Sequence, residues 1–292
     1  MKTEDKTRVA VLGYGNIGKA VEKAVSTTND MTLAGIFHHD EISRLEAAYP
    51  DIVLLGVPSR EVPATAEQLL KKGLNTVDSF DIHTQIPAVH QRLNEAARAN
   101  KAVSILSAGW DPGSDSVVRA LMQALLPQGI TYTDFGPGRS MGHTVAAKAV
   151  EGVKNALSMT IPLGTGIHRR MVYVEIKDGY SYNQVRDAIL KDDYFAHDET
   201  HVIEVDNVEA LNNVAHGVRL TRNGVSGQTH NQRIEMTMSI NNPALTGQIM
   251  VASARAAIRM ARNEKFGCYT MIELAPVDLL EGEREDWIRK IV

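Results

Sequence analysis

The sequence predicts an α/β protein: a doubly wound parallel sheet, followed by a second α+β domain on a mixed or antiparallel sheet. Up to about residue 111, short apolar runs alternate with helical spacings, which is the β-α-β-α order of a parallel sheet. Later strands are longer or alternate between polar and apolar residues, as in an antiparallel sheet with one face in water. A chain of 292 residues is long enough for two such domains.

The first strand, at residues 8–13, runs directly into a glycine-rich turn, and a helical pattern follows. This is the setting of the G-x-G-x-x-G fingerprint of Rossmann domains, whose glycines permit a tight turn, a close pyrophosphate and close helix packing. The pyrophosphate would rest on the unpaired N–H groups of the helix. The residues predicted to bind a dinucleotide are Gly13, Tyr14, Gly15, Asn16, Ile17 and Gly18. The alternative is a glycine-rich turn without a ligand.

The second strand, at 33–37, ends where a Rossmann chain carries the residue that reads the ribose. An NAD site favours Asp or Glu there, whereas this chain has His38 and His39, followed by Asp40. Two imidazoles can donate hydrogen bonds to a 2′-phosphate, so the sequence favours NADP, with both histidines as ligands. NAD is not excluded, because Asp40 can turn inward. The three residues can also be a solvated loop.

The next strands of the first sheet follow in order. The continuous apolar run at 52–57 is typical of a strand buried on both faces, and it ends at Pro58 and Ser59. Because nicotinamide-side loops lie at this end of a Rossmann sheet, we predict that both residues contact the cofactor. A helix is predicted at 63–72, and short strands at 75–78 and 102–106.

Beyond residue 113 the pattern changes, which predicts a second domain. Its strands are predicted at 171–176, 201–205 and 233–240, and its helices at 116–126 and 181–191. An alanine-rich helix at 247–262 is predicted to return to the first domain. The predicted division is a dinucleotide-binding domain at 1–115, joined by 243–292, and a substrate-binding and dimerisation domain at 116–242.

Composition excludes several classes of partner. A net charge of −4 gives no electrostatic basis for binding nucleic acid or an anionic membrane. No apolar stretch approaches the ~18 residues of a membrane span, and the polar N-terminus lacks a signal-peptide core. The single cysteine, Cys268, cannot form an internal disulfide, so a reducing cytoplasm is expected. His197 and His201 do not form a metal-binding pattern, and no metal is expected.

Two carboxylates follow predicted strands of the first sheet. Asp81 comes after the strand at 75–78, and Asp111 after the strand at 102–106. Because ligands bind beyond the C-terminal ends of such strands, these acids can hold an ammonium group and take its proton before a hydride leaves the carbon. Alternatively, Asp81 caps a helix and Asp111 opens the turn at Pro112.

Other polar residues of the second domain have weaker patterns. Arg169 and Arg170 can clamp a carboxylate, because guanidinium binds carboxylates in bidentate fashion; the alternative is a solvated strand edge. His216 and Asn242 are expected in loops beside the alternating strand at 233–240, and alone they indicate little. That strand is a candidate dimer sheet, or else one solvated face of a monomer.

Taken together, the motifs resemble those of the meso-diaminopimelate dehydrogenases over essentially the whole chain. The Gly-Trp-Asp-Pro-Gly run at 109–113 and the Gly-Pro-Gly-x-Ser-x-Gly-His run at 136–143 are far more specific than the nucleotide motif. Further matches lie at 11–18, 77–83, 242–243, 255–260 and 272–276.

The resemblance implies NADP-linked, reversible oxidative deamination of the D-centre of meso-2,6-diaminopimelate to L-2-amino-6-oxopimelate and ammonia. It implies that Asp81 and Asp111 bind the reacting amino group, with Trp110 also in the substrate site. It places Met141 and Gly142 at the same end and Phe135 in an aromatic pocket position. The positions implied for the distal L-centre are Thr160, Arg170, His216 and Asn242. Family members typically form homodimers.

The chain departs from many relatives at three places. His38 and His39 stand where many members have two arginines, and Met141 stands where many have Gln. The segment between Thr160 and His168 is short, and in this the chain resembles a compact subgroup of the family. That subgroup is associated with a broader substrate range, which includes amination of other 2-keto acids to D-amino acids. Two alternatives to the family activity are another Rossmann reductase of the lysine or aspartate pathway and a non-catalytic NADP sensor.

Overall fold

A computed structural model describes residues 6–211 and 216–292. The chain divides into two compact units. The first unit comprises Met1–Ala120 and Asn242–Val292, and the second comprises Leu121–Asn241. The predicted architecture is confirmed: a parallel sheet with helices, and a separate unit with mixed and antiparallel sheets.

The first unit is built on a six-stranded parallel sheet with strand order β13-β5-β4-β3-β1-β2. Its strands are β1 (Thr7–Leu12), β2 (Met31–Phe37), β3 (Ile52–Leu55), β4 (Asn75–Asp78), β5 (Val103–Leu106) and β13 (Gly267–Thr270). Its helices are α1 (Asn16–Ser26), α2 (Ile42–Ala47), α3 (Val62–Leu70), α4 (Ile86–Ala99), α5 (Ser114–Leu125, which runs past Ala120), α8 (Asn242–Arg262) and α9 (Arg284–Ile291).

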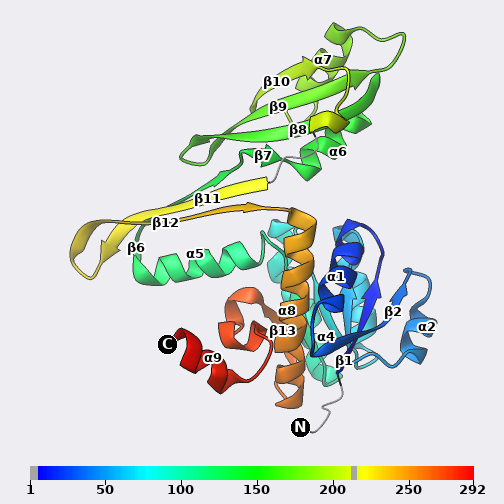
Figure 1. The fold of residues 1–292 in the computed structure, drawn as a ribbon, viewed down its shortest axis with the longest axis vertical. Coiled ribbons are helices and arrows are strands. Elements are labelled where there is room, and N and C mark those ends of the chain that lie inside the picture. Colours follow the sequence, from blue (N-terminus) through cyan, green and yellow to red (C-terminus); the bar gives the residue numbers. More distant parts are fainter. Residues whose placement is uncertain (1–5, 212–215) are drawn as a thin grey trace. The chain divides into compact units, whose positions relative to one another are not determined.

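Both faces of this sheet are buried, which explains the continuous apolar runs. Successive residues of a strand point to opposite faces, so Val9 and Val11 join the core beneath α1 and α8, while Ala10 and Leu12 join the core beneath α3 and α4. Figure 1 shows α1 and α8 side by side over one face. The strand order places the C-terminal ends of β4 and β5 next to each other.

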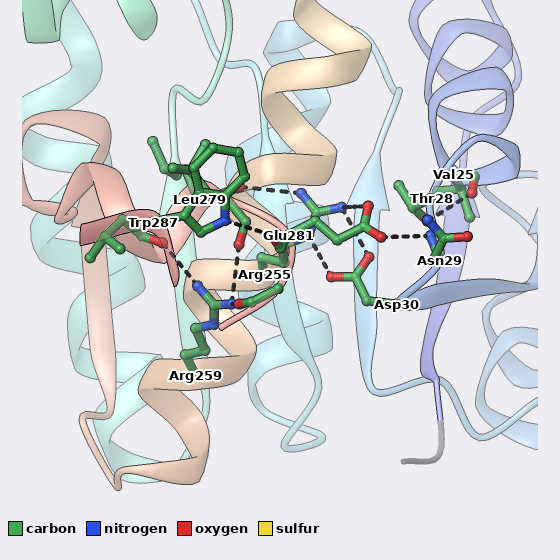
Figure 2. Close-up of polar contacts among 12 residues, drawn as sticks. Val25, Thr28, Asn29, Asp30, Arg255, Arg259, Leu279, Glu281 and Trp287 are labelled. Carbon is green, nitrogen blue, oxygen red and sulfur yellow. Dashed lines mark hydrogen bonds and ion pairs between the residues drawn. The ribbon is translucent and has the colours of Figure 1, made fainter. Parts of the chain in front are cut away.

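Helix α8 is fixed at its C-terminal half by two arginines (Figure 2). Arg255 is almost fully buried and pairs with Asp30 through Nε and Nη2, the latter 3.0 Å from Oδ1. Arg259 donates to main-chain carbonyls of the C-terminal segment, those of Val277, Leu280 and Gly282. Glu281 of the same segment accepts from the Asn29 N–H at 3.1 Å. These contacts join the C-terminal segment and the α1–β2 turn to α8.

The second unit contains two sheets. The four-stranded sheet has the order β10-β9-β8-β7, with β10 and β9 parallel and the other pairs antiparallel; the three-stranded sheet, β12-β11-β6, is antiparallel. The strands are β6 (Gln128–Phe135), β7 (Gly138–Arg139), β8 (Val153–Gly164), β9 (Ile167–Ile176), β10 (Glu199–Glu204), β11 (His216–Ser226) and β12 (Thr229–Ile240). Helices α6 (Met141–Ala149) and α7 (Tyr182–Lys191) pack on the four-stranded sheet.

Two local predictions are wrong, and one strand begins earlier than predicted. Arg169 and Arg170 lie within β9, which begins at Ile167 rather than at residue 171, and His216 lies within β11 rather than in a loop. Asn242 and Pro243 begin α8, because proline is accommodated in the first turn of a helix, where its missing N–H has no partner to lose. Among the helices of the described residues, none combines the length and the apolar character that a membrane crossing requires.

Candidate active site

The glycine-rich turn after β1 is held by close backbone packing. Gly13 has φ +93°, and a Cβ built there would lie 2.7 Å from the backbone of Gly56 at the end of β3. A Cβ on Gly18 would lie 2.1 Å from the Gly13 carbonyl oxygen. Only glycine satisfies both contacts, so the turn is fixed by α1 and by β3 together. The role of Gly56 was not predicted, because its partners are distant in the sequence.

The start of α1 fits a dinucleotide pyrophosphate. A Cβ on Gly15 would have no atom within 4 Å, so the space above this residue is open. In the described chain, no side-chain hydrogen bond caps α1, and its first turn holds no acidic residue. The first N–H groups of α1 therefore point to a site suited to a phosphate anion. The side chain of Tyr14 bends back along α1, where its hydroxyl donates to Glu22 at 2.5 Å.

The predicted ribose-side residues follow β2. His38 and His39 are exposed, and the His38 N–H donates to Glu41 Oε2 at 2.9 Å. Glu41 also pairs with Arg44 at the start of α2. The exposed imidazoles come directly after the strand end, as the sequence predicts. Their contact with a cofactor remains a prediction.

Ser59 and Asp81 lie together at the neighbouring strand ends. The Ser59 hydroxyl, which follows β3 and Pro58, donates to Asp81 Oδ1 at 2.6 Å. Asp81 is exposed and follows β4, so its carboxylate is oriented at one oxygen and open to solvent. The sequence predicted Ser59 as a cofactor ligand, and the structure gives it a partner within the candidate acid–base pair.

Asp78, the last residue of β4, joins the two loops that carry the predicted acids. Its Oδ1 accepts the N–H of Phe80 at 2.9 Å and the N–H of Ser107 at 3.0 Å. Burial raises the pKa of the Asp78 carboxyl to about 6, against the lowering effect of these two hydrogen bonds. One carboxylate therefore fixes the start of the Asp81 loop and the start of the Asp111 loop.

Asp111 is paired rather than free. Arg119 Nη1 donates to Asp111 Oδ1 at 2.7 Å, and Arg119 Nη2 lies 4.0 Å from Asp115 Oδ2. Asp115 is completely buried in the first turn of α5. Its pKa is raised to about 7 by burial and by the charge of Asp111, while Arg119 and a hydrogen bond with the buried Trp110 act to lower it.

In the second unit, Arg170 is the centre of a polar cluster. It lies opposite Thr160 in the β8–β9 register, and its Nη1 donates to the Thr160 hydroxyl. Its Nε donates to Asp198 Oδ2 at 2.6 Å. These two hydrogen bonds orient the Arg170 guanidinium on a rigid sheet, and a guanidinium held in this way is suited to binding a carboxylate.

Three histidines lie around this cation. Burial is the main cause that lowers the pKa of His143, His168 and His216, and the charge of Arg170 lowers each further. Phe135 stacks on His216, with ring centroids 6.5 Å apart, and donates its N–H to His168 Nε2 at 2.8 Å. A lowered pKa favours the neutral imidazole, in which one ring nitrogen accepts a hydrogen bond, as His168 Nε2 does from Phe135.

The remaining predicted residues lie at helix starts. Met141 and Gly142 are exposed in the first turn of α6. The preceding Ser140 hydroxyl bonds His143 Nδ1 at 2.8 Å and does not cap the helix. Asn242 begins α8, and its Oδ1 accepts from the Thr246 hydroxyl at 2.9 Å.

Sequence reasoning missed several residues of these clusters. Asp115 and Arg119 share one face of α5 at the i, i+4 spacing, which was the available signal. For Asp198 the sequence held no signal, because Asp198 reaches Arg170 only through the β9–β10 pairing. Among residues 6–211 and 216–292, no group of three or more His, Cys, Asp or Glu side chains is arranged to hold a metal ion.

Comparison with known proteins identifies the family. Residues 109–169 match the family model described as the diaminopimelic acid dehydrogenase C-terminal domain. Meso-diaminopimelate D-dehydrogenase of Bacteroides fragilis is 51% identical over 98% of this chain and 99% of its own length.

Solved structures agree with this similarity. The diaminopimelate (DAP) dehydrogenase of Corynebacterium glutamicum, in complex with DAP, matches with a TM-score of 0.87 and 30% identity over 98% of this chain and 99% of its own. An engineered D-amino acid dehydrogenase bound to NADP⁺ matches with a TM-score of 0.82 and 28% identity over 99% and 100%. This chain belongs to the meso-diaminopimelate D-dehydrogenase family.

Proposed function

We propose that this chain is an NADP-dependent oxidoreductase that deaminates the D-centre of meso-2,6-diaminopimelate reversibly, giving L-2-amino-6-oxopimelate and ammonia. Its relatives of known structure include a DAP complex and an NADP⁺ complex. The observation that carries the proposal is the placement of Asp81 and Asp111 after the adjacent strands β4 and β5. Ligands of open α/β sheets bind at this edge.

The acid–base work falls to these two aspartates. Asp111 and Asp81 would hold the ammonium group and accept its proton, directly or through water, so that the amine lone pair is available as hydride leaves the carbon. NADP, when bound through the glycine-rich turn and α1, supplies the hydride acceptor. Water then adds to the carbon of the resulting substrate iminium, and the C–N bond breaks, which leaves the 2-oxo group and releases ammonia. In the reverse direction the same carboxylates return protons to the amine nitrogen.

Substrate orientation requires a different set of groups at the distal L-centre. We propose that Arg170 and Thr160 bind its carboxylate and that His216 and Asn242 bind its amino group or border it. Met141, Gly142, Trp110 and Phe135 would line the reacting end. A site that hydrogen-bonds each group of its ligand strongly rejects one with a group missing or misplaced, so such a grip would set which end reacts.

The test is formation of the reduced cofactor, NADPH from NADP or NADH from NAD, followed by absorbance with purified protein and meso-diaminopimelate. The expected result is turnover with NADP that depends on diaminopimelate. Cofactor binding without turnover would indicate a sensor, and turnover confined to other substrates would indicate a different reductase. The NAD arm tests whether His38 and His39 confer the predicted preference.

We also propose a broader substrate range, because the segment between Thr160 and His168 is short, as it is in the compact subgroup. Reductive amination of pyruvate or phenylpyruvate with ammonia and NADPH would produce D-amino acids, and absence of that activity would contradict this breadth. We also propose a cytoplasmic homodimer in which β12 contributes to the dimer sheet. Light scattering of the purified protein measures the oligomeric state, and a monomer would exclude the dimer.

A further inference from the structure

The proposed role of Asp111 leaves a local problem of charge. The guanidinium of Arg119 lies 2.7 Å from Asp111 Oδ1 and neutralises this carboxylate. An ammonium group that approaches such a pair meets little net attraction, and the guanidinium repels it. Asp111 and Arg119 alone therefore form a poor site for the substrate amine.

Asp115 lies where it can correct this balance. It is one helical turn before Arg119 on α5, and Oδ2 is 4.0 Å from Arg119 Nη2. Its side chain has no exposed surface, so water screens its charge little. Its N–H donates to the Trp110 carbonyl at 3.0 Å, which fixes the first turn of α5 against the residue before Asp111.

We propose that Asp115 is a positioning residue that balances the charge of Arg119, so that Asp111 remains available to the substrate's ammonium group. This inference rests on the proposed function. With Asp115 ionised, one guanidinium faces two carboxylates, and the cluster carries one net negative charge that an ammonium ion neutralises. With Asp115 protonated, the cluster is neutral and attracts ammonium weakly.

The surroundings of Asp115 allow this exchange near neutral pH. Burial and Asp111 raise its pKa to about 7, and Arg119 opposes them. In the described part of the chain, Asp111 and Arg119 are the charged groups with a resolved effect on Asp115. An arriving ammonium ion favours the ionised form, so amine binding expels the Asp115 proton. The 2-oxo end of the deaminated product carries no cation and has no such effect.

The experiment compares KM values in the two reaction directions. Asp115→Asn keeps the size of the side chain and removes its charge. We expect the KM for meso-diaminopimelate to rise about tenfold or more, because one nearby unscreened charge is lost. The KM for L-2-amino-6-oxopimelate should stay within about twofold, by the same charge argument. Asp30→Asn, which removes a carboxylate beside the buried Arg255 outside the site, is the matched control and should leave both KM values unchanged.

A second variant separates charge from structure. Asp115→Asn combined with Arg119→Gln leaves Asp111 as the only charge of the cluster and should restore a low KM for diaminopimelate. If Asp115→Asn changed both KM values equally, or if the double variant did not recover a low KM for diaminopimelate, the charge-balance role would be overturned. The proposed function would stand in that case, because the wild type would still turn over diaminopimelate. Absence of diaminopimelate-dependent turnover by the wild type would overturn the proposed function, and the charge-balance role with it.

Discussion

Asp78 offers the sharpest test of how the two acid-bearing loops are fixed. Replacement by Ala removes the acceptor of two buried N–H groups, those of Phe80 and Ser107. Each buried donor left without a partner costs about 1–3 kcal/mol, so near pH 4, where the Asp78 carboxyl of the folded protein is protonated and no buried charge is removed, Asp78→Ala should destabilise the protein by about 2–6 kcal/mol. Because both loops then lose their common anchor, kcat/KM should fall as well, although Asp78 is not proposed to touch substrate.

Asp78→Asn isolates the effect of the charge. The folded-state pKa of Asp78 is raised from 3.8 to about 6, so between these values the folded protein keeps a proton that the unfolded chain has lost. Wild-type stability therefore decreases as pH rises through this window. From these two pKa values the charge costs about 2 kcal/mol at pH 5 and about 3 kcal/mol at pH 8. Asn carries no such cost, although its buried NH₂ group needs an acceptor.

The assay is urea unfolding of wild type and Asp78→Asn at pH 5 and pH 8. The stability of the variant relative to wild type should improve by about 1 kcal/mol between the two pH values. Asp51→Asn is the control, since Asp51 also accepts a main-chain N–H, that of Arg8 at 2.7 Å, but lies on the surface. A relative stability of Asp78→Asn that is the same at both pH values would refute the buried-charge argument.

Three further predictions concern the glycine turn and the substrate groups. Gly18→Ala should unfold the turn, because the added Cβ would overlap the Gly13 carbonyl. Gly15→Ala should keep the wild-type Tm and bind NADP more weakly, and equal Tm losses of the two variants in thermal unfolding would contradict this. Asp111→Ala should lower kcat/KM by about 10² or more, and near-normal turnover in the absorbance assay would remove Asp111 from the mechanism. Arg170→Ala should mainly raise the KM for diaminopimelate, and an unchanged KM would misplace the distal site.

Much of the first unit could be predicted because its signals are local. A strand buried on both faces is a continuous apolar run, and the glycine turn has a fixed spacing, so β1, β3, β4 and the start of α1 were placed within about two residues. In the second unit, β8 and β11 were missed, since their half-buried residues do not alternate cleanly. The predicted strand at 171–176 began four residues late, because the charged side chains of Arg169 and Arg170 obscure the start of β9.

The candidate site was predictable only as far as its individual residues. The positions of Asp81 and Asp111 follow from strand ends, which the sequence marks. Their partners do not: Ser59 reaches Asp81 from another strand end, and Arg119 and Asp115 reach the Asp111 loop from α5. Such pairings depend on tertiary packing, which single-sequence patterns do not carry.

The buried acids point to the same loop as the motifs. Among Asp and Glu of the described chain, a raised pKa is resolved for Asp78 and Asp115, and each is completely buried. Asp78 holds the first N–H of the loop at 107–113, and the Asp115 N–H holds the Trp110 carbonyl near its end. Both carboxylates lower stability at neutral pH when ionised, since the folded state disfavours their charge. This loss of stability, from one carboxylate on each side of a short loop, is explained if the loop must hold Asp111 in a fixed position and a fixed charge environment. A proton-accepting role for Asp111 requires both.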